Sequence, residues 1–419
     1  MVSKEKFYGK RNYNTNGGIT LIALVITIIV LLILAGVTIA ALSGDNGILT
    51  RAKEAKEKTQ QSQKEEEKTL SNMENILGVY NFKNINVADT NPGGVVPENS
   101  IVLEDDVNKG IVIKDKNNNE WVWVEVPKTT VFSGLTIDTT GTLTEQNYTD
   151  IKNKLIAYAI TYRKGTATQN ENWTDEWYDG CGLTSDEYAI AYQKMLKSVY
   201  TYGGFWIGRY EAGIEDSIEN VSKARTSHTD IIIGTSPKAI SQKDAIPYNH
   251  VYCGEAQALA KEMTPDSSYT SSLMFGIQWD LVCKYLEVKG GLATADINSD
   301  SSTWGNYNDT ERKITSKKAK QSANHGNSWN LIKEKKPASD IILSTGASEE
   351  TNKMNIYDFA GNEWEWTLEH ATSSNDYHCA DRGGCYNCPA SRDPASYRTS
   401  IYRTYSDYSI SFRTTLYAL

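Results

Sequence analysis

Apolar and polar positions divide the chain into parts with different periods. The first 18 residues are polar and basic, and residues 19–42 form an apolar run without a charged side chain. Residues 43–79 alternate charges at helical spacing, with Glu54 four residues before Lys58, the favourable order for a helical ion pair. From about residue 101, short runs of β-branched and aromatic residues alternate with turn-forming residues, a pattern typical of strands joined by loops.

The apolar run "ITLIALVITIIVLLILAGVTIAAL" predicts a membrane-spanning helix over residues 19–42. At 1.5 Å per residue it extends roughly 36 Å, enough to cross the hydrocarbon core of a bilayer. The preceding segment is net basic, so the positive-inside tendency places residue 1 in the cytoplasm and the remaining chain outside. Residues 43–79 predict a polar helical stalk, and residues 80–100, which contain "NPGG", predict a linker.

The basic leader, residues 1–18, ends in Gly17-Gly18 directly before the apolar run, whereas a secretory signal is cut after its apolar region. This order resembles the prepilin signal of type IV pilins. The resemblance implies that a prepilin peptidase cuts after Gly18, leaving Ile19 first in a protein of the bacterial cell envelope with an extracellular globular domain. The fifth mature residue is Ala23, where pilins usually have Glu, so both a pilus-like assembly and simple membrane tethering stay open.

Residues 101–419 predict one elaborated α+β domain. The stretch "GIVIKDKNNNEWVWVEVP" at 110–127 predicts a hairpin, and "SDEYAIAYQKMLKSVYTYG" and "GEAQALAKEM" predict helices. Five motifs follow in order: "GGFWIGRYEAG", "FGIQWDLVCKYL", "NIYDFAGNEWEWT", "RGG" and "SFRTTLY". They resemble the formylglycine-generating enzyme (sulfatase-modifying factor) family, which implies a C-type-lectin-like fold. Trp206, Trp364 and Trp366 are then expected in or near the core.

The catalytic chemistry of that family is not expected here. Its enzymes hold copper between two cysteines five residues apart, and the matching positions are Cys388 and Asp393. A single thiolate does not supply the two-sulfur coordination that Cu(I) favours, so we expect no enzyme activity and no cofactor. Zinc held by Cys379, Cys385, Cys388 and His378 is a weaker alternative to a disulfide among these cysteines. Calcium in the lectin-like loops stays open, with no residues assigned to it.

The composition of residues 370–419 is unusual. The segment has no Lys, Glu, Gln, Met or Trp, although the chain has six Met and ten Trp residues. Those five types are the ones that cannot arise when the first two bases of an AAC or AAT codon are randomised. The segment therefore resembles the variable region of proteins diversified by adenine-mutating retroelements, whose targets include this type of lectin-like domain.

The resemblance implies a ligand-binding face within about residues 377–410, on a framework of Arg382, Gly383, Gly384, Phe412 and Arg413. The substituted positions that it implies are Tyr377, His378, Cys385, Asn387, Cys388, Arg392, Asp393, Tyr397, Thr399, Ile401, Tyr402, Tyr405, Asp407 and Tyr408. Tyrosines supply rigid contact area at low entropic cost, so they suit a binding surface.

We therefore expect a surface-displayed protein that binds a protein or cell-surface ligand. The formal net charge of −9 and the pI near 5.3 argue against a nucleic-acid partner, since phosphate binding requires concentrated basic side chains. Three alternatives stay open: an envelope oxidase, a minor pilin with a structural head, and a Tyr-rich loop that only packs on the domain.

Overall fold

A computed structural model describes residues 21–43, 51, 53–65, 89–163, 172–372 and 378–418. The chain divides into two compact units, Met1–Met73 and Glu74–Leu419. The expected leader, with its cleavage site between Gly18 and Ile19, lies outside the described residues, as does Tyr377. Peptidase processing therefore stays a prediction.

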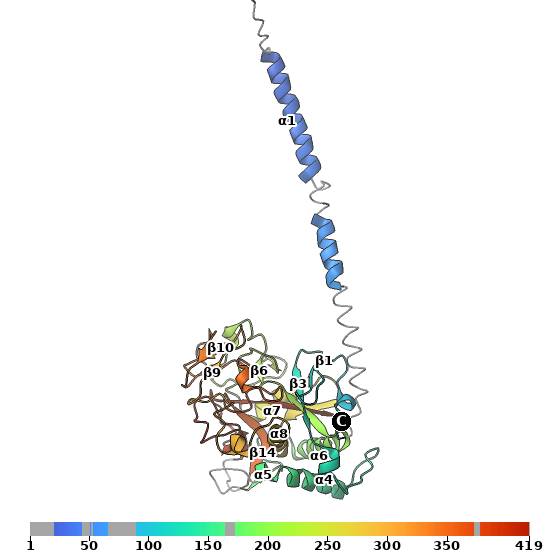
Figure 1. The fold of residues 1–419 in the computed structure, drawn as a ribbon, viewed down its shortest axis with the longest axis vertical. Helices are drawn as coiled ribbons and strands as arrows, with labels where there is room; N and C mark the ends of the chain where they lie inside the picture. Colours follow the sequence, from blue (N-terminus) through green and yellow to red (C-terminus); the bar gives the residue numbers. More distant parts are fainter. Residues whose placement is uncertain are drawn as a thin grey trace, which may run out of the picture. The chain divides into compact units, whose positions relative to one another are not determined.

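The first unit contains the apolar helix α1 (Leu21–Ser43) and a second helical stretch at residues 53–65 (Figure 1). No helix in the described part of the chain is long and apolar enough to cross a membrane. The apolar run forms this helix over Leu21–Ser43. The expectation of a transmembrane pilin-like helix over 19–42, and of an envelope location through that helix, is therefore wrong.

The second unit is α+β, and its largest sheet has the strand order β1-β2-β3-β5-β18-β8. These strands are β1 (Ile101–Glu104), β2 (Val112–Lys114), β3 (Glu120–Glu125), β5 (Gly204–Gly208), β8 (Tyr269–Leu273) and β18 (Thr414–Ala418). The predicted hairpin is confirmed, because β2 pairs antiparallel with β3. Its turn forms around Asp115, whose Oδ1 accepts hydrogen bonds from the backbone N–H groups of Asn117 and Asn119.

A second sheet contains many of the residues from 370 to 419, and its strand order is β16-β15-β14-β17. Its strands are β14 (Trp364–Ala371), β15 (Cys379–Arg382), β16 (Arg398–Ile401) and β17 (Ile410–Phe412), and β4 (Trp173–Thr174) pairs with β14. β14 and β17 are parallel, whereas the other pairs are antiparallel. Only Arg413 separates β17 from β18, so the chain passes directly from the second sheet into the first.

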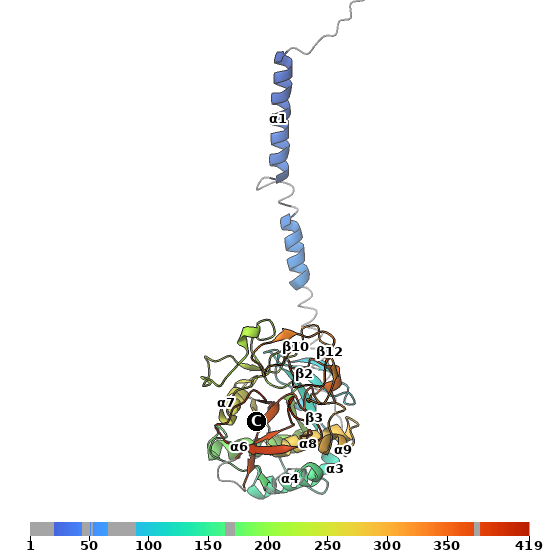
Figure 2. The same ribbon diagram turned by 90° about the vertical axis from the view of Figure 1, so that its left-hand side faces the viewer.

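Four longer helices surround the sheets: α4 (Glu145–Tyr158), α6 (Ser185–Tyr202), α7 (Cys253–Glu262) and α8 (Gly276–Val288). Helix α6 begins at a capping box of Thr184 and Glu187 and ends at Gly203, whose φ of 74° suits glycine. Within this unit, α4 and the strands β9 and β10 lie at opposite ends (Figures 1 and 2). The shorter elements are η1 (Pro92–Val95), α3 (Lys128–Val131), α5 (Ile160–Arg163), β6 (Gly213–Ile214), η2 (Val221–Lys223), β7 (Ala239–Ile240), α9 (Thr294–Asn298), β9 (Arg312–Lys313), β10 (Lys320–Ser322), β11 (Asn330–Leu331), β12 (Lys335–Lys336), β13 (Ile342–Leu343) and η3 (Glu349–Thr351).

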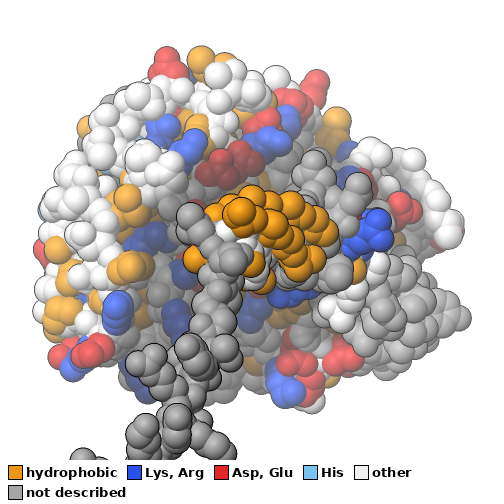
Figure 3. All heavy atoms as spheres, turned by 90° about the horizontal axis from the view of Figure 1, so that it is seen from above, with side chains coloured by type: hydrophobic (Ala, Val, Ile, Leu, Met, Phe, Trp, Pro, Cys, Tyr) orange, Lys and Arg blue, Asp and Glu red, His pale blue; other side chains and the backbone are white. Residues whose placement is uncertain are grey.

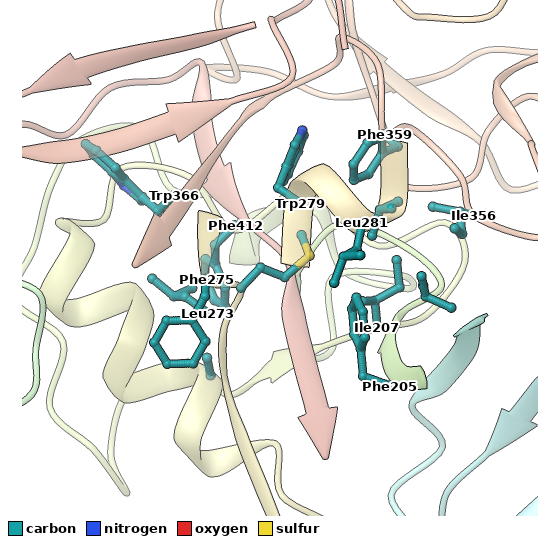
Figure 4. Close-up of a cluster of buried hydrophobic side chains, with 14 of the residues drawn as sticks. Phe205, Ile207, Leu273, Phe275, Trp279, Leu281, Ile356, Phe359, Trp366 and Phe412 are labelled. Atoms are coloured by element: carbon teal, nitrogen blue, oxygen red, sulfur yellow. The ribbon is translucent and has the colours of Figure 1, made fainter. Parts of the chain in front are cut away.

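The main core lies between the two sheets and α8. Trp279 of α8 stacks on Phe359 with ring centroids 4.1 Å apart, and Trp366 and Phe412 come from neighbouring strands (Figure 4). Trp206 and Trp366 are fully buried and Trp364 is 8% exposed. The tryptophans of the sequence motifs are thus core residues, and they provide a rigid base beneath the C-terminal segment.

Candidate functional site

The C-terminal segment, which is residues 382–413 from here on, begins at a buried network of charged side chains. Arg382, at the end of β15, donates to Asp280 Oδ1 at 2.9 Å and to Glu369 Oε2 at 2.8 Å. Arg398 lies within 2.9 Å of Asp280 and 3.2 Å of Glu369. Burial raises the pKa of Asp280, but the guanidinium groups of Arg398, Arg382 and Arg163 outweigh it and hold that pKa below its usual value. Removing one partner from such a network leaves a buried charge uncompensated.

The two glycines after Arg382 form a turn that no other residue type fits. Gly383 and Gly384 have φ values of 94° and 78°, in the left-handed region that disfavours a side chain. A Cβ on Gly384 would lie 2.2 Å from the carbonyl oxygen of Asp393 and 2.8 Å from the Tyr307 ring. The backbone of residue 393 therefore packs against this turn, and the loop from 385 to 397 closes over it.

Arg413 holds the other end of the segment. Its Nη2 lies 2.7 Å from Glu365 Oε1 on β14, and both groups are buried. The same guanidinium donates to the backbone carbonyls of Gly208 at 3.0 Å and Tyr357 at 2.9 Å. Both ends of the C-terminal segment are therefore attached to the core by charge-assisted hydrogen bonds, which are among the stronger ones in proteins.

The predicted binding residues, from 377 to 408, differ in exposure. Arg392 and Tyr402 are exposed, with Tyr402 at 46%. The half-buried ones are His378, Asn387, Thr399, Ile401, Tyr405, Asp407 and Tyr408. The buried ones are Cys385, Cys388, Asp393 and Tyr397. Apart from Tyr377, which is not described, nine of the residues thus have accessible surface and four lie beneath it.

The four buried residues stabilise the loop between 385 and 397. Cys385 and Cys388 form a disulfide, so neither supplies a thiolate for copper or zinc. Asp393 pairs with Arg392 at 2.8 Å, and the ring centroid of Tyr397 lies 5.9 Å from that of Trp364. In this structure these residues contact their own chain, and the expectation of no copper-dependent activity stays a prediction.

Residues 402–409 form a compact turn that presents the remaining tyrosines. The backbone N–H of Tyr405 donates to the carbonyl of Tyr402 at 2.9 Å, and the Tyr405 hydroxyl donates to Asp407 Oδ2 at 2.7 Å. Asp407 Oδ1 also accepts from the backbone N–H of Ser409 at 3.1 Å. Burial is the largest cause that raises the pKa of Tyr405, and its bond to Asp407 adds to it, so this phenol stays protonated and donates.

Residues outside the predicted segment contact its 402–409 turn. Asn249 Nδ2 donates to the carbonyl of Tyr408 at 3.0 Å, and the backbone N–H of His250 donates to the carbonyl of Asp407 at 3.0 Å. The His325 ring lies 4.3 Å from that of Tyr408. The sequence prediction missed these three residues because it used the composition of residues 370–419 alone, and no local motif marks them.

One group in the described part of the chain has the geometry of a metal site. The ligand atoms of His228, Asp230 and Glu255 lie within 4.8 Å of one another. His228 Nε2 lies 3.0 Å from Glu255 Oε2, and Glu255 also accepts the backbone N–H groups of Ile231 and Tyr252 at the start of α7. These contacts explain the arrangement without an ion. The expectation of no metal and no cofactor, like the open question of calcium, stays a prediction.

On the face drawn in Figure 3, the blue Lys and Arg side chains lie among red Asp and Glu side chains. The described residues on that face form no continuous basic patch of the kind that a phosphate backbone requires. The expectation that nucleic acid is not a partner stays a prediction.

Comparisons with family models, curated proteins and solved structures give different outcomes. No family model matches it, and no curated protein matches it. Treponema denticola variable protein 1 has a weakly similar structure, with a TM-score of 0.29 and 15% identity over 51% of this chain and 84% of that chain. A crystal structure of CarF has a TM-score of 0.32 and 12% identity over 52% of this chain and 87% of that chain. The functional argument therefore rests on the residues of this chain.

Proposed function

We propose that residues 101–419 form a C-type-lectin-like domain of the formylglycine-generating type, and that its C-terminal segment is a retroelement-diversified surface that binds a protein or cell-surface ligand. One observation carries the proposal. The segment is attached to the core at Arg382 and Arg413, while most of the residues implied to vary between them have accessible surface. Such a division allows the binding residues to change while the scaffold keeps its contacts.

The side chains on this surface have the chemistry of a paratope. Tyr402 is exposed, Tyr405 and Tyr408 are half-buried, and Arg392, in the 385–397 loop, is exposed. Tyrosine and arginine are enriched among residues that contribute most to protein binding. Hydrogen bonds from Asn249 and His250 hold the backbone of 407 and 408, which reduces the ordering entropy that binding costs.

The proposal assigns no oxidase activity to the domain. A copper oxidase of the related type needs two thiolates, and here Cys388 is paired with Cys385 while the second position is Asp393. The residues present therefore do not fit the copper site of that family.

A codon library tests the proposal directly. The full chain is prepared by ribosome display with NNY codons at five surface positions, Asn387, Arg392, Thr399, Tyr402 and Asp407. We expect most members to stay resistant to protease, and selection on an immobilised probe protein such as hen lysozyme to return binders with micromolar Kd.

A matched library with the same codons at three buried positions of the second sheet, Ala380, Arg398 and Ser411, is the control, and most of its members should lose protease resistance. If the surface library loses resistance to the same degree, the segment is a structural loop and the proposal is wrong. A resistant surface library that returns no binder on several probe proteins would also contradict it.

A further inference from the structure

One buried acid beneath the C-terminal segment has no partner. The side chain of Asp381, in β15, is 0% exposed, and no other residue in the described chain forms a hydrogen bond to Oδ1 or Oδ2. A buried carboxyl without a partner destabilises a fold, because it loses the hydrogen bonds that water supplied. Packing alone does not explain why an acid occupies this position.

Strand register places Asp381 beside the aromatic face of the second sheet. It lies opposite Trp366 on β14 and opposite Thr399 on β16, and opposed residues on paired strands point to the same side of a sheet. Arg382, the next residue, therefore points to the other side, where it pairs with Asp280. The carboxyl of Asp381 thus shares a face with aromatic side chains and with a residue of the proposed binding surface.

The charged and titratable neighbours of Asp381 do not stabilise the ionised form of its carboxyl. Burial raises its pKa to about 8, and Asp393 adds to the rise, whereas its own backbone N–H and Arg382 act to lower it. Asp381 in turn affects the titration of Cys253, at the start of α7, and of Tyr405. Neither of these can neutralise a carboxylate, because a thiol and a phenol are neutral or negative.

Two arginines in this part of the chain, Arg382 and Arg392, are already engaged. Arg382 makes ion pairs with Asp280 and Glu369. Arg392, whose side chain is 61% exposed, pairs with Asp393. The region around Asp381 is therefore acidic, aromatic and without a free cation among the described residues. Carboxylates and aromatic faces together are the groups that recognise ammonium and guanidinium ions.

We propose that Asp381 is a ligand-binding residue, and that it pairs with a lysine or arginine side chain of a peptide or protein bound on the C-terminal segment. This inference rests on the proposed function and names the chemical class of the ligand group. The incoming cation replaces the proton of the carboxyl, so binding forms one ion pair and releases one proton to solvent. Because Asp381 is fully buried in the free protein and Tyr405 lies within its electrostatic reach, the side chains that cover Asp381 must move for the cation to reach it.

The test uses the full chain and a pair of small probes. Nα-acetyl-arginine amide carries the cation, and the matching citrulline amide has the same shape without the charge. We expect the arginine probe to bind at millimolar concentration by NMR titration, at least tenfold more tightly than the citrulline probe. Its affinity should increase between about pH 6 and pH 8 as the carboxyl ionises.

Asp381→Asn should weaken binding of the arginine probe at least tenfold and abolish its pH dependence. Asp358→Asn is the matched control, since Asp358 is a buried acid whose oxygens accept from Gly346 and Thr351. It should lower the melting temperature and leave probe binding unchanged, whereas Asp381→Asn should not lower the melting temperature.

Equal affinity for the two probes, no binding of either, or an unchanged affinity in Asp381→Asn would overturn the assignment. The surface codon library separates this failure from that of the proposed function. If the library returns binders whose affinity does not depend on Asp381, the C-terminal segment binds ligands but Asp381 has no part in it.

Discussion

Replacing Arg413 with methionine tests whether the scaffold holds the C-terminal segment as described. The change removes the ion pair to Glu365 and the two hydrogen bonds to the carbonyls of Gly208 and Tyr357. Breaking a buried ion pair by removing one partner costs about 3–5 kcal/mol. Protonation of Glu365 relieves part of this cost, while each carbonyl left without a donor adds about 1 kcal/mol. We expect a loss of about 4 kcal/mol in the free energy of unfolding.

A double-mutant cycle isolates the ion pair from the packing. Glu365→Met alone leaves the guanidinium without its carboxylate and should also cost about 3 kcal/mol or more. The double variant, with methionine at both positions, should cost at least about 1.5 kcal/mol less than the sum of the single variants, because contacting partners are not additive.

Urea unfolding of the full chain, followed by tryptophan fluorescence, gives the free energies by linear extrapolation. Tyr402→Ala is the control, since an exposed substitution away from the core changes stability by no more than about 0.5 kcal/mol. A loss below about 1 kcal/mol in Arg413→Met, or strict additivity in the cycle, would refute the assignment of Arg413 to the scaffold.

Four further outcomes are expected. In a binder selected on the surface library with Tyr402 retained, Tyr402→Ala should weaken binding at least tenfold while the melting temperature changes little; a large fall in melting temperature would indicate a structural role. Gly384→Ala should cost about 3 kcal/mol by urea unfolding, through the left-handed φ and the contact with the backbone of residue 393, and a neutral effect would contradict the turn. Titration of the oxidised chain with Cu(I) should show no stoichiometric site that depends on Cys388, and tight binding lost in Cys388→Ser would revive the oxidase alternative. The pKa of Asp381 is raised to about 8, so the folded protein keeps a proton that the unfolded chain has lost above about pH 4. Stability should therefore fall as the pH rises from about 4 to about 8, by up to about 1.4 kcal/mol per pH unit, and Asp381→Asn should remove that contribution in melts at several pH values.

Local patterns predicted several elements correctly. The alternation around Trp121 and Trp123 predicted the β2–β3 hairpin, and helical periodicity predicted α6 and α7. These elements are decided by short-range turn chemistry and by the spacing of apolar residues, both of which are visible in the sequence. The apolar run at 19–42 also formed a helix, but helix formation and membrane crossing are separate properties, and only the first is found.

The division of the C-terminal segment into surface and interior was not visible in the sequence. Tyr397 and Tyr402 have the same side chain, yet Tyr397 packs on Trp364 while Tyr402 is 46% exposed. The difference arises because Tyr397 precedes β16 and its carbonyl accepts a hydrogen bond from the backbone N–H of Gly383, whereas Tyr402 lies in the turn that follows β16. Codon composition is the basis on which variable positions were predicted, and it says nothing about tertiary contacts. For the same reason Asp381, a buried residue of β15, was not among the predicted binding residues.

The arrangement limits which variants of the segment can fold. Exposed positions such as Arg392 and Tyr402 have few core contacts, so their substitutions should combine almost additively and with little cost. Positions 385, 388 and 397 are buried, so a change there leaves an unpaired cysteine or a cavity beneath the loop, and each such defect costs stability. Changes at 385 and 388 should therefore occur together among folded variants, whereas changes at 402 should be independent of both. Under the proposed function, the buried half of the segment restricts which substitutions the exposed half can combine.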